Sequence, residues 1–224
     1  MNELIEINRG RQAKVYKYNN QALKIMTLTK YTHHHFQEFN QSELKNMEGF
    51  IKYRSIKFDE MKIFIYMDLY KTDLFDYIKK RNTFLNEQEA KIIFRKICKS
   101  VQTMHKKGLC HRDIKPENIL MNKNNITSNT EIVLCDLEAF ANINGYFSRL
   151  SYGTPYYLAP EAQYYSVHPK LDIYSLGKTL WITTGSDKTL MSKSMYDLYF
   201  HMTNTNVQNR YDIDQVMSHE WIQN

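Results

Sequence analysis

The sequence predicts an α+β fold in which β-strands come first and helices follow. Residues 4–26 alternate apolar and polar side chains, as expected of strands that cover one face of a core. Residues 86–104 instead carry apolar side chains at helical spacing. The chain has 224 residues, of which 42% are hydrophobic, so it can form one sizeable domain or two small lobes. Strands followed by helices are typical of the α+β class.

Three strands are expected at the start of the chain. The pair Asn19-Asn20 predicts a tight turn between two of them. Another strand is expected at residues 61–67, because aromatic and β-branched side chains predominate there. The alternation in the first strands predicts these buried positions: Ile5, Ile7, Val15, Ala22 and Leu23.

A long helix is expected to begin after Asn86, which can cap its first turn while Glu89 completes a capping box. Gly108 offers a left-handed residue at its end. The apolar run 132–134 predicts a buried strand that leads to an acid, Asp136. The apolar stripe of the helix consists of Ile93, Ile97, Val101 and Met104.

Composition argues against several classes of protein. No apolar run approaches the roughly 20 residues of a membrane span, and the first residues do not resemble a signal peptide. We therefore expect an intracellular protein of the cytoplasm or nucleus, without a membrane partner. The net charge of +6 comes from scattered lysines and arginines, so a nucleic-acid partner is not expected. The three cysteines lack paired spacing and are expected to be reduced.

The most informative segment is His-Arg-Asp-Ile-Lys-Pro-Glu-Asn at residues 111–118. Phosphoryl transfer from ATP needs a carboxylate at the attacking hydroxyl, a cation on the moving phosphoryl group and an oxygen ligand for magnesium. Asp113, Lys115 and Asn118 supply these three groups in that order.

This octapeptide resembles the catalytic loop of eukaryotic protein kinases. Residues 153–161, Gly-Thr-Pro-Tyr-Tyr-Leu-Ala-Pro-Glu, resemble a second motif of the same family. The resemblance implies a bilobal protein kinase fold that fills residues 1–224 as a single domain. Its N-lobe would be a small β-sheet with one helix, at about residues 1–68. A hinge would follow at about 68–71, and a mainly helical C-lobe at about 72–224.

The resemblance also implies an activity. A lysine two residues after Asp113 is the pattern of serine/threonine kinases. We expect transfer of the ATP γ-phosphoryl group, with Mg²⁺, to Ser or Thr hydroxyls of protein substrates. Asp113 would receive or orient the hydroxyl proton, and Lys115 would stabilise the phosphoryl charge. The protein is expected to be a monomer that can accept a regulatory partner.

The nucleotide-binding residues are expected mainly in the first lobe. Residues 8–15 resemble the glycine-rich loop, with only its middle glycine kept. Lys24 matches the lysine that contacts the α- and β-phosphates, and a helix glutamate should hold it. Glu38 has the better spacing for that glutamate, whereas Glu43 has the better helix face. We choose Glu38 and keep Glu43 as the alternative.

Other positions that the resemblance assigns to the nucleotide surround the adenine and the ribose. Met67 would lie behind the adenine, and the backbone of Asp68 and Tyr70 would bind its edge. Asp73 matches an acidic residue near the ribose, although it also suits the start of a helix. The full set is Ile7, Asn8, Gly10, Val15, Ala22, Lys24, Met67, Asp68, Tyr70, Asp73 and Leu120.

The metal ligands implied are Asn118 and Asp136. The family motif Asp-Phe-Gly is replaced by Asp136-Leu137-Glu138, which should restrict the segment that follows. Glu138 and the glycine-poor nucleotide loop support an alternative function. In that alternative the chain is a pseudokinase that binds nucleotide or serves as a scaffold.

The resemblance implies supporting contacts as well. Thr154 should hydrogen-bond near Asp113 and Lys115, and Asp172 should hold the backbone of the catalytic loop. Two pairs are expected elsewhere: Glu161 with Arg210, and Glu117 with Asp73 as a site for substrate arginines. Residues 216–222 resemble the closing helix and the His-x-Trp ending of many kinase domains.

Overall fold

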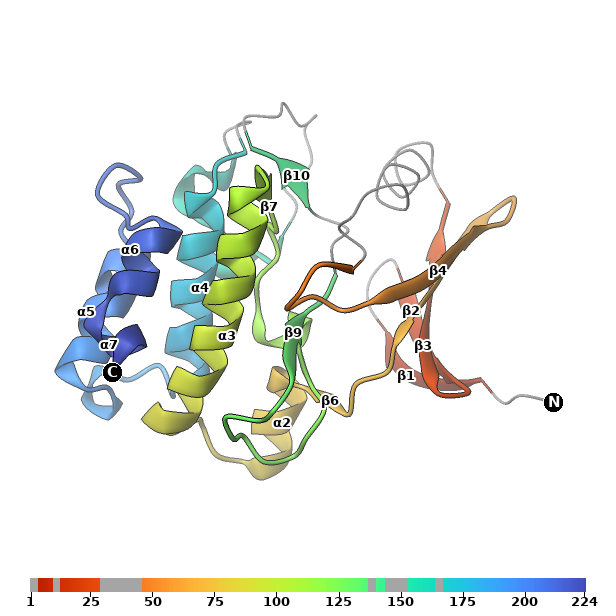
Figure 1. Cartoon of the computed structure of the whole chain (residues 1–224), viewed down its shortest axis with the longest axis horizontal. Coiled ribbons are helices and arrows are strands. Elements are labelled where there is room, and N and C mark those ends of the chain that lie inside the picture. Colours follow the sequence, from red (N-terminus) through yellow and green to blue (C-terminus); the bar gives the residue numbers. More distant parts are fainter. Residues whose placement is uncertain (1–3, 10–12, 29–45, 137–139, 144–152, 164–166) are drawn as a thin grey trace. The chain divides into compact units, whose positions relative to one another are not determined.

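The computed structural model describes residues 4–9, 13–28, 46–136, 140–143, 153–163 and 167–224 (Figure 1). The chain divides into two compact units, Met1–Tyr70 and Lys71–Asn224. An antiparallel sheet forms most of the described part of the first unit, and the described α-helices belong to the second. The predicted α+β class is therefore confirmed.

Five strands form the sheet of the first unit. They are β1 (Ile5–Arg9), β2 (Ala13–Tyr18), β3 (Gln21–Thr27), β4 (Tyr53–Phe58) and β5 (Lys62–Asp68). Their order across the sheet is β1-β2-β3-β5-β4, and each neighbouring pair is antiparallel. The three strands predicted at the start and the later strand predicted at residues 61–67 are all present.

Local sequence explains the turn and one face of this sheet. Asn19 adopts a φ of 54°, a left-handed conformation that asparagine tolerates better than most residues. Alternate side chains of β5 are buried at Ile63, Ile65 and Met67, because successive residues of a strand point to opposite faces. Ala22 of β3 is buried beside Met67, its partner across the strands.

The prediction that Ile5 and Ile7 are buried is wrong. They are 51% and 49% exposed, and every residue of β1 is exposed. Because β1 is an edge strand of the sheet, it pairs with β2 alone. The alternation of apolar and polar side chains along β1 therefore does not correspond to burial. The strand also carries an irregularity between Glu6 and Asn8.

The second unit combines helices with short strands. Its α-helices are α2 (Leu74–Arg81), α3 (Glu87–Lys106), α4 (Lys170–Thr183), α5 (Lys193–Met202), α6 (Ile213–Ser218) and α7 (Glu220–Gln223). Its strands are β6 (Thr72–Asp73), β7 (Leu109–Cys110), β8 (Ile119–Met121), β9 (Ile132–Leu134) and β10 (Ala141–Asn142). Strands β6, β8 and β9 make one small sheet, and β7 pairs with β10.

Helix α3 is central in this unit, where it packs against α4, α6, α7 and the strands β7 and β9 (Figure 1). It begins as predicted, since Asn86 and Glu89 form both hydrogen bonds of a capping box. Its predicted apolar stripe is fully buried, and each such side chain contributes roughly 2 kcal/mol of transfer free energy. Gly108 follows at a φ of 75°.

The end of the chain forms a helix, α6, that is followed by the shorter helix α7. His219 is extended, with φ −65° and ψ 140°, and separates α6 from α7. Its Nδ1 accepts a hydrogen bond from the backbone N–H of Trp221, so it caps α7. Within the described residues, no helix combines the length and the apolar character that crossing a bilayer requires.

Candidate active site

The catalytic loop is fixed at both ends by secondary structure. It leaves β7 at Cys110 and passes through a short 3₁₀ helix, Pro116–Asn118, before it enters β8 at Ile119. The predicted catalytic residues, Asp113 and Lys115, lie between these elements.

Asp172, on the first turn of α4, holds the backbone of this loop as the resemblance implied. Its Oδ2 accepts the backbone N–H of His111 at 2.8 Å, and its Oδ1 accepts that of Arg112 at 2.7 Å. Arg112 has a φ of 71°, which costs a non-glycine residue conformational free energy. The buried carboxylate stabilises this unusual backbone.

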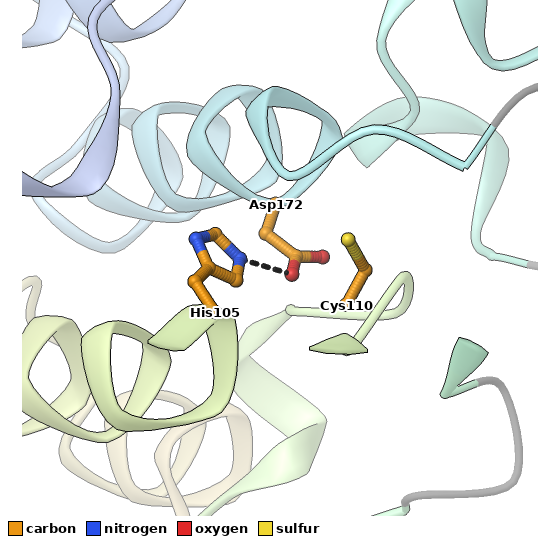
Figure 2. A group of neighbouring side chains, drawn as sticks. All are labelled: His105, Cys110 and Asp172. Atoms are coloured by element: carbon orange, nitrogen blue, oxygen red, sulfur yellow. Dashed lines mark hydrogen bonds and ion pairs between the residues drawn. The ribbon is translucent and has the colours of Figure 1, made fainter. Parts of the chain in front are cut away.

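His105 also helps Asp172 to hold the loop, and the sequence did not predict this role. Its Nε2 lies 2.8 Å from Oδ2 of Asp172, as Figure 2 shows. Asp172 is 0% exposed. Burial opposes its ionisation, but the hydrogen bond from His105 and the nearby backbone N–H groups hold its pKa below the ordinary aspartate value. Asp172 is therefore an anion with full hydrogen bonding.

Cys110 lies beside His105 and Asp172, and the possible ligand atoms of the three residues lie within 4.8 Å of one another (Figure 2). These three side chains are not suited to bind a metal ion. Both oxygens of Asp172 already accept hydrogen bonds from the loop and from His105. Burial and the Asp172 carboxylate also raise the pKa of the Cys110 thiol, whereas coordination needs a thiolate.

Asp113, Lys115 and Thr154 form a closed ring of hydrogen bonds. The Lys115 Nζ donates to Asp113 Oδ2 and to Thr154 Oγ1, each at 2.7 Å. Thr154 Oγ1 donates to Asp113 Oδ1 at 3.1 Å. The ring places a carboxylate and an ammonium group side by side in a partly buried position, as a proton acceptor and a phosphoryl-binding cation require.

Asn118 joins the ring through its amide group. Its Nδ2 donates to the backbone oxygen of Asp113 at 2.8 Å and to the Oδ2 of that residue at 3.0 Å. This assignment directs the amide hydrogens to Asp113 and makes Oδ1 the atom suited to a cation. Such oxygens are the ligands that Mg²⁺ prefers.

The second predicted metal ligand, Asp136, follows β9. The backbone N–H of Cys135 donates to the Asn118 carbonyl at 3.0 Å, so the pairing of β8 and β9 continues to the residue before Asp136. Asp136 itself has a φ of 65°. The donor set of one amide oxygen and one carboxylate fits a hard divalent cation. Glu138 lies outside the described residues.

Gly153 lets the segment before Thr154 approach the catalytic loop. Its φ is +117°, and a Cβ there would lie 2.9 Å from the Arg112 carbonyl and 2.5 Å from Cδ2 of Leu158. A side chain at this position would therefore push the segment away from the loop. Ser175 of α4 fixes the segment further on, by donating to the Tyr157 carbonyl at 2.9 Å.

Glu161 and Arg210 form the ion pair that the resemblance implied. Both terminal nitrogens of the guanidinium donate to the Glu161 carboxylate, one of them at 2.9 Å. Arg210 also donates to the carbonyls of Lys170 and Asn204, and it is only 1% exposed. The pair ties the residues after Thr154 to α4 and to the end of the chain.

Apart from Lys115, the residues predicted to contact the triphosphate belong to the first unit. Lys24 lies in β3, between Val15 of β2 and Ile65 of β5. Asn8 is exposed on β1. Three predicted residues, Gly10, Glu38 and Glu43, lie outside the part of the chain that the structure describes.

The predicted hinge residue Asp68 is engaged within the first unit. Its backbone N–H donates to the Lys52 carbonyl at 3.1 Å, and its Oδ1 accepts from Arg54 at 2.5 Å. The backbone carbonyl is therefore the group that we expect at the adenine edge. Tyr70, the other predicted hinge residue, is half-buried.

Asp73 and Leu120 lie side by side, as partners in the pairing of β6 with β8. The Asp73 carboxylate caps α2 by accepting the backbone N–H of Asp76 at 2.8 Å. Burial raises its pKa above the ordinary aspartate value, despite this hydrogen bond. The reading of Asp73 as a helix cap is thus confirmed, whereas its place near a ribose stays a prediction.

The sequence also resembles those of known proteins. A family model, the protein kinase domain, matches residues 2–190. Calcium-dependent protein kinase 3 of Plasmodium yoelii yoelii is 32% identical over 192 residues, which cover 79% of this chain and 34% of that protein. The carbon catabolite-derepressing protein kinase of Candida glabrata is 30% identical over 175 residues, or 66% of this chain and 28% of that protein. The chain spans about a third of the length of such relatives.

Proposed function

Because the chain belongs to the protein kinase family, we propose that it is an active serine/threonine kinase that transfers the γ-phosphoryl group of ATP to protein hydroxyls. The hydrogen-bonded ring of Asp113, Lys115 and Thr154 is the observation that carries this proposal. We further propose one kinase domain, with an N-lobe at about residues 1–68, a hinge at 68–71 and a C-lobe at 72–224.

In the proposed mechanism, Asp113 orients the substrate hydroxyl and takes up its proton as the oxygen attacks phosphorus. Lys115 neutralises charge on the phosphoryl group as it moves between oxygens. Thr154 and Asn118 hold the Asp113 carboxylate by donating to its two oxygens, so the base needs no reorganisation when substrate arrives. Asp172 positions the whole loop through its backbone.

Asn118 and Asp136 would hold Mg²⁺, which when bound neutralises the phosphate oxygens. Lys24 would contact the α- and β-phosphates, and Glu38 or its alternative Glu43 would orient the lysine. The adenine and ribose would then be bound by the remaining predicted residues: Ile7, Asn8, Gly10, Val15, Ala22, Met67, Asp68, Tyr70, Asp73 and Leu120.

The charges beside the catalytic loop support a preference for basic substrates. The Oε2 of Glu117 is buried and has no hydrogen-bond partner among the described residues. Burial, and then the negative charge of Glu117, raise the pKa of Tyr157. Glu117 also contributes to the raised pKa of Asp73. We propose that a substrate arginine before the acceptor residue pairs with these two carboxylates.

The proposal is tested by phosphotransfer. Purified chain with Mg²⁺, labelled ATP and a basic Ser/Thr peptide should incorporate phosphate, and Asp113→Asn should lower kcat about 10²- to 10⁴-fold. Nucleotide affinity, measured by calorimetry, should be the same in both proteins. Nucleotide binding without transfer above the level of Asp113→Asn would instead support a pseudokinase that binds nucleotide or acts as a scaffold.

A further inference from the structure

A groove lies on α3, in the second unit and apart from the catalytic loop. It has a volume of about 560 Å³ and runs over the first half of α3, between Ser128 in the β8–β9 connection and Asn224 after α7. Figure 1 shows α7 packed beside α3 on this side. Lys91, Ile92 and Arg95 contribute to its floor.

Two cations in this groove lack an acidic partner. Lys91 and Arg95 are four residues apart and therefore lie on the same face of the helix. Neither forms an ion pair within the part of the chain that the structure describes. The described contact of the Lys91 ammonium is with the Trp221 ring, at 5.8 Å. Like charges at this spacing destabilise a helix, so a bound anion would remove a repulsion as well as gain an attraction.

Arg95 is incompletely hydrogen-bonded. Its Nε donates to the backbone carbonyl of Ile222, which orients the guanidinium between α3 and α7. Its Nη2 is buried and has no acceptor among the described residues. A buried donor of a charged group without an acceptor is unfavourable, and a turn of the guanidinium toward a ligand oxygen in the groove would remove that cost.

Glu87, an acid near these two cations, forms its hydrogen bonds with residues of other elements. Its Oε1 accepts from the Ser192 hydroxyl at 2.6 Å and from the Trp221 indole N–H at 2.7 Å. It thus joins α3 to Ser192, which precedes α5, and to α7. Glu87 also lines the groove, but among the described residues it forms no ion pair with Lys91 or Arg95. Ser128, in the β8–β9 connection, also lines the groove.

We propose that this groove binds a phosphorylated segment of a partner protein, with Lys91 and Arg95 on the phosphate. A phosphate monoester carries a charge of about −1.5 to −2 at pH 7, which matches two unpaired cations better than a single carboxylate does. Arginine presents several N–H donors in a geometry that suits phosphate oxygens. The groove is also much larger than a phosphate ion, so it has room for the flanking peptide.

The test uses a capped alanine peptide with one central phosphoserine, its unphosphorylated form, and inorganic phosphate. Each is titrated into the ¹⁵N-labelled chain with a saturating non-hydrolysable ATP analogue and Mg²⁺, so that the nucleotide site is blocked. The phosphopeptide should shift the backbone amides of Gln88, Ile92 and Ser128. Lys91→Met should weaken its binding about tenfold, as expected for one charge-assisted hydrogen bond.

Lys99→Met is the matched control, because Lys99 is an exposed residue of α3 that does not line the groove and its loss changes the net charge equally. It should leave the affinity unchanged. Arg95→Lys keeps the charge and should weaken binding less than Arg95→Met. Thermal unfolding of each variant checks that the fold is retained.

Three results would overturn the proposal: no shift at the groove amides, equal weakening by Lys99→Met, or equal binding of the unphosphorylated peptide. Inorganic phosphate that binds as tightly as the phosphopeptide would assign the groove to free phosphate and exclude the peptide. None of these measurements involves phosphotransfer, so their failure would leave the proposed catalytic function untouched.

Discussion

The catalytic loop and the strand β1 differ in how their predicted functional residues are held. In the loop, Asp113 accepts hydrogen bonds from Lys115, Asn118 and Thr154. On β1, by contrast, Ile7 is 49% exposed on a strand that pairs on one side only.

This difference predicts that substitutions in the two regions have different effects on stability and on ligand affinity. The proposed proton acceptor depends on buried contacts that also stabilise the second unit, so changes there should affect folding and chemistry together. The proposed nucleotide contact of β1 is made at an exposed edge, so changes there should alter ligand affinity at almost constant stability. The five predictions that follow test this separation, beginning with the largest effect.

Removal of the Arg210 guanidinium should be the most destabilising change. Arg210→Met leaves Glu161 without its partner and should lower the free energy of unfolding by about 3–5 kcal/mol. Urea denaturation provides the measurement. The control is Arg9→Met on β1, which breaks an exposed pair with Glu6 and should change stability little. Equal losses in both variants would contradict the contrast between the two regions.

Asp172→Asn should have the second largest effect on stability. Its amide N–H₂ group would face backbone N–H donors that hydrogen-bond to a carboxylate oxygen in the natural chain. We expect a loss of about 2–3 kcal/mol in the free energy of unfolding. The kcat for phosphotransfer should fall as well, since the loop backbone at Arg112 would lose its acceptor. A variant with normal stability and normal kcat would show that the carboxylate does not anchor the loop.

The same carboxylate gives a pH dependence. Because the folded pKa of Asp172 is lower than its unfolded value of about 3.9, its contribution to stability is present above that value. It is lost as the pH falls through the lower, folded pKa. The stability gap between the natural chain and Asp172→Asn should therefore be constant near neutral pH and narrow below about pH 4. A gap that stayed constant below pH 4 would show that ionisation of Asp172 is not the source of the stability.

Thr154→Val should have a smaller effect, seen mainly in kcat and to a lesser degree in stability. It removes the hydroxyl that connects Asp113 with Lys115, and one hydrogen bond to a charged group corresponds to roughly a tenfold loss in kcat. Thr154→Ser keeps the hydroxyl and should retain most of the activity. Steady-state assays at saturating ATP distinguish the two variants, and similar losses in both would argue that the methyl group matters more.

Ile7→Ala should produce the smallest effect. We expect the KM for ATP to rise a few-fold, with a change in unfolding free energy below about 0.5 kcal/mol, because the side chain is half exposed. Leu4→Ala is the control, since Leu4 is equally exposed but has no predicted contact with nucleotide. A large loss of stability in Ile7→Ala would show that β1 is not a peripheral strand.

Local patterns predicted the parts of the fold whose interactions are local. The capping box at Asn86 and the turn at Asn19 depend on neighbouring residues, and both are present. The exposure of Ile7 depends on which strands pair with β1, and no short pattern contains that information. His105 was missed for a similar reason, because its partner Asp172 lies 67 residues away in the sequence.

For the candidate site, family resemblance supplied what local patterns could not. The pairing of Glu161 with Arg210 spans 49 residues and was expected only because the motifs around both residues resemble those of kinases. The resemblance named the closing helix and its His-x-Trp ending, but it did not give the boundary between α6 and α7 at His219. Resemblance transfers contacts between motifs better than it transfers the boundaries of elements.

The position of Arg210 in the chain has a consequence for synthesis. Ribosomes make proteins from the N-terminus, so the catalytic loop and Glu161 leave the exit tunnel before Arg210 has emerged. Until then the Glu161 carboxylate has no guanidinium partner, and the segment around Thr154 lacks its tie to α4. A nascent chain therefore carries every proposed catalytic group before the ion pair that secures their neighbourhood can form, and its activity should begin only after Arg210 has emerged.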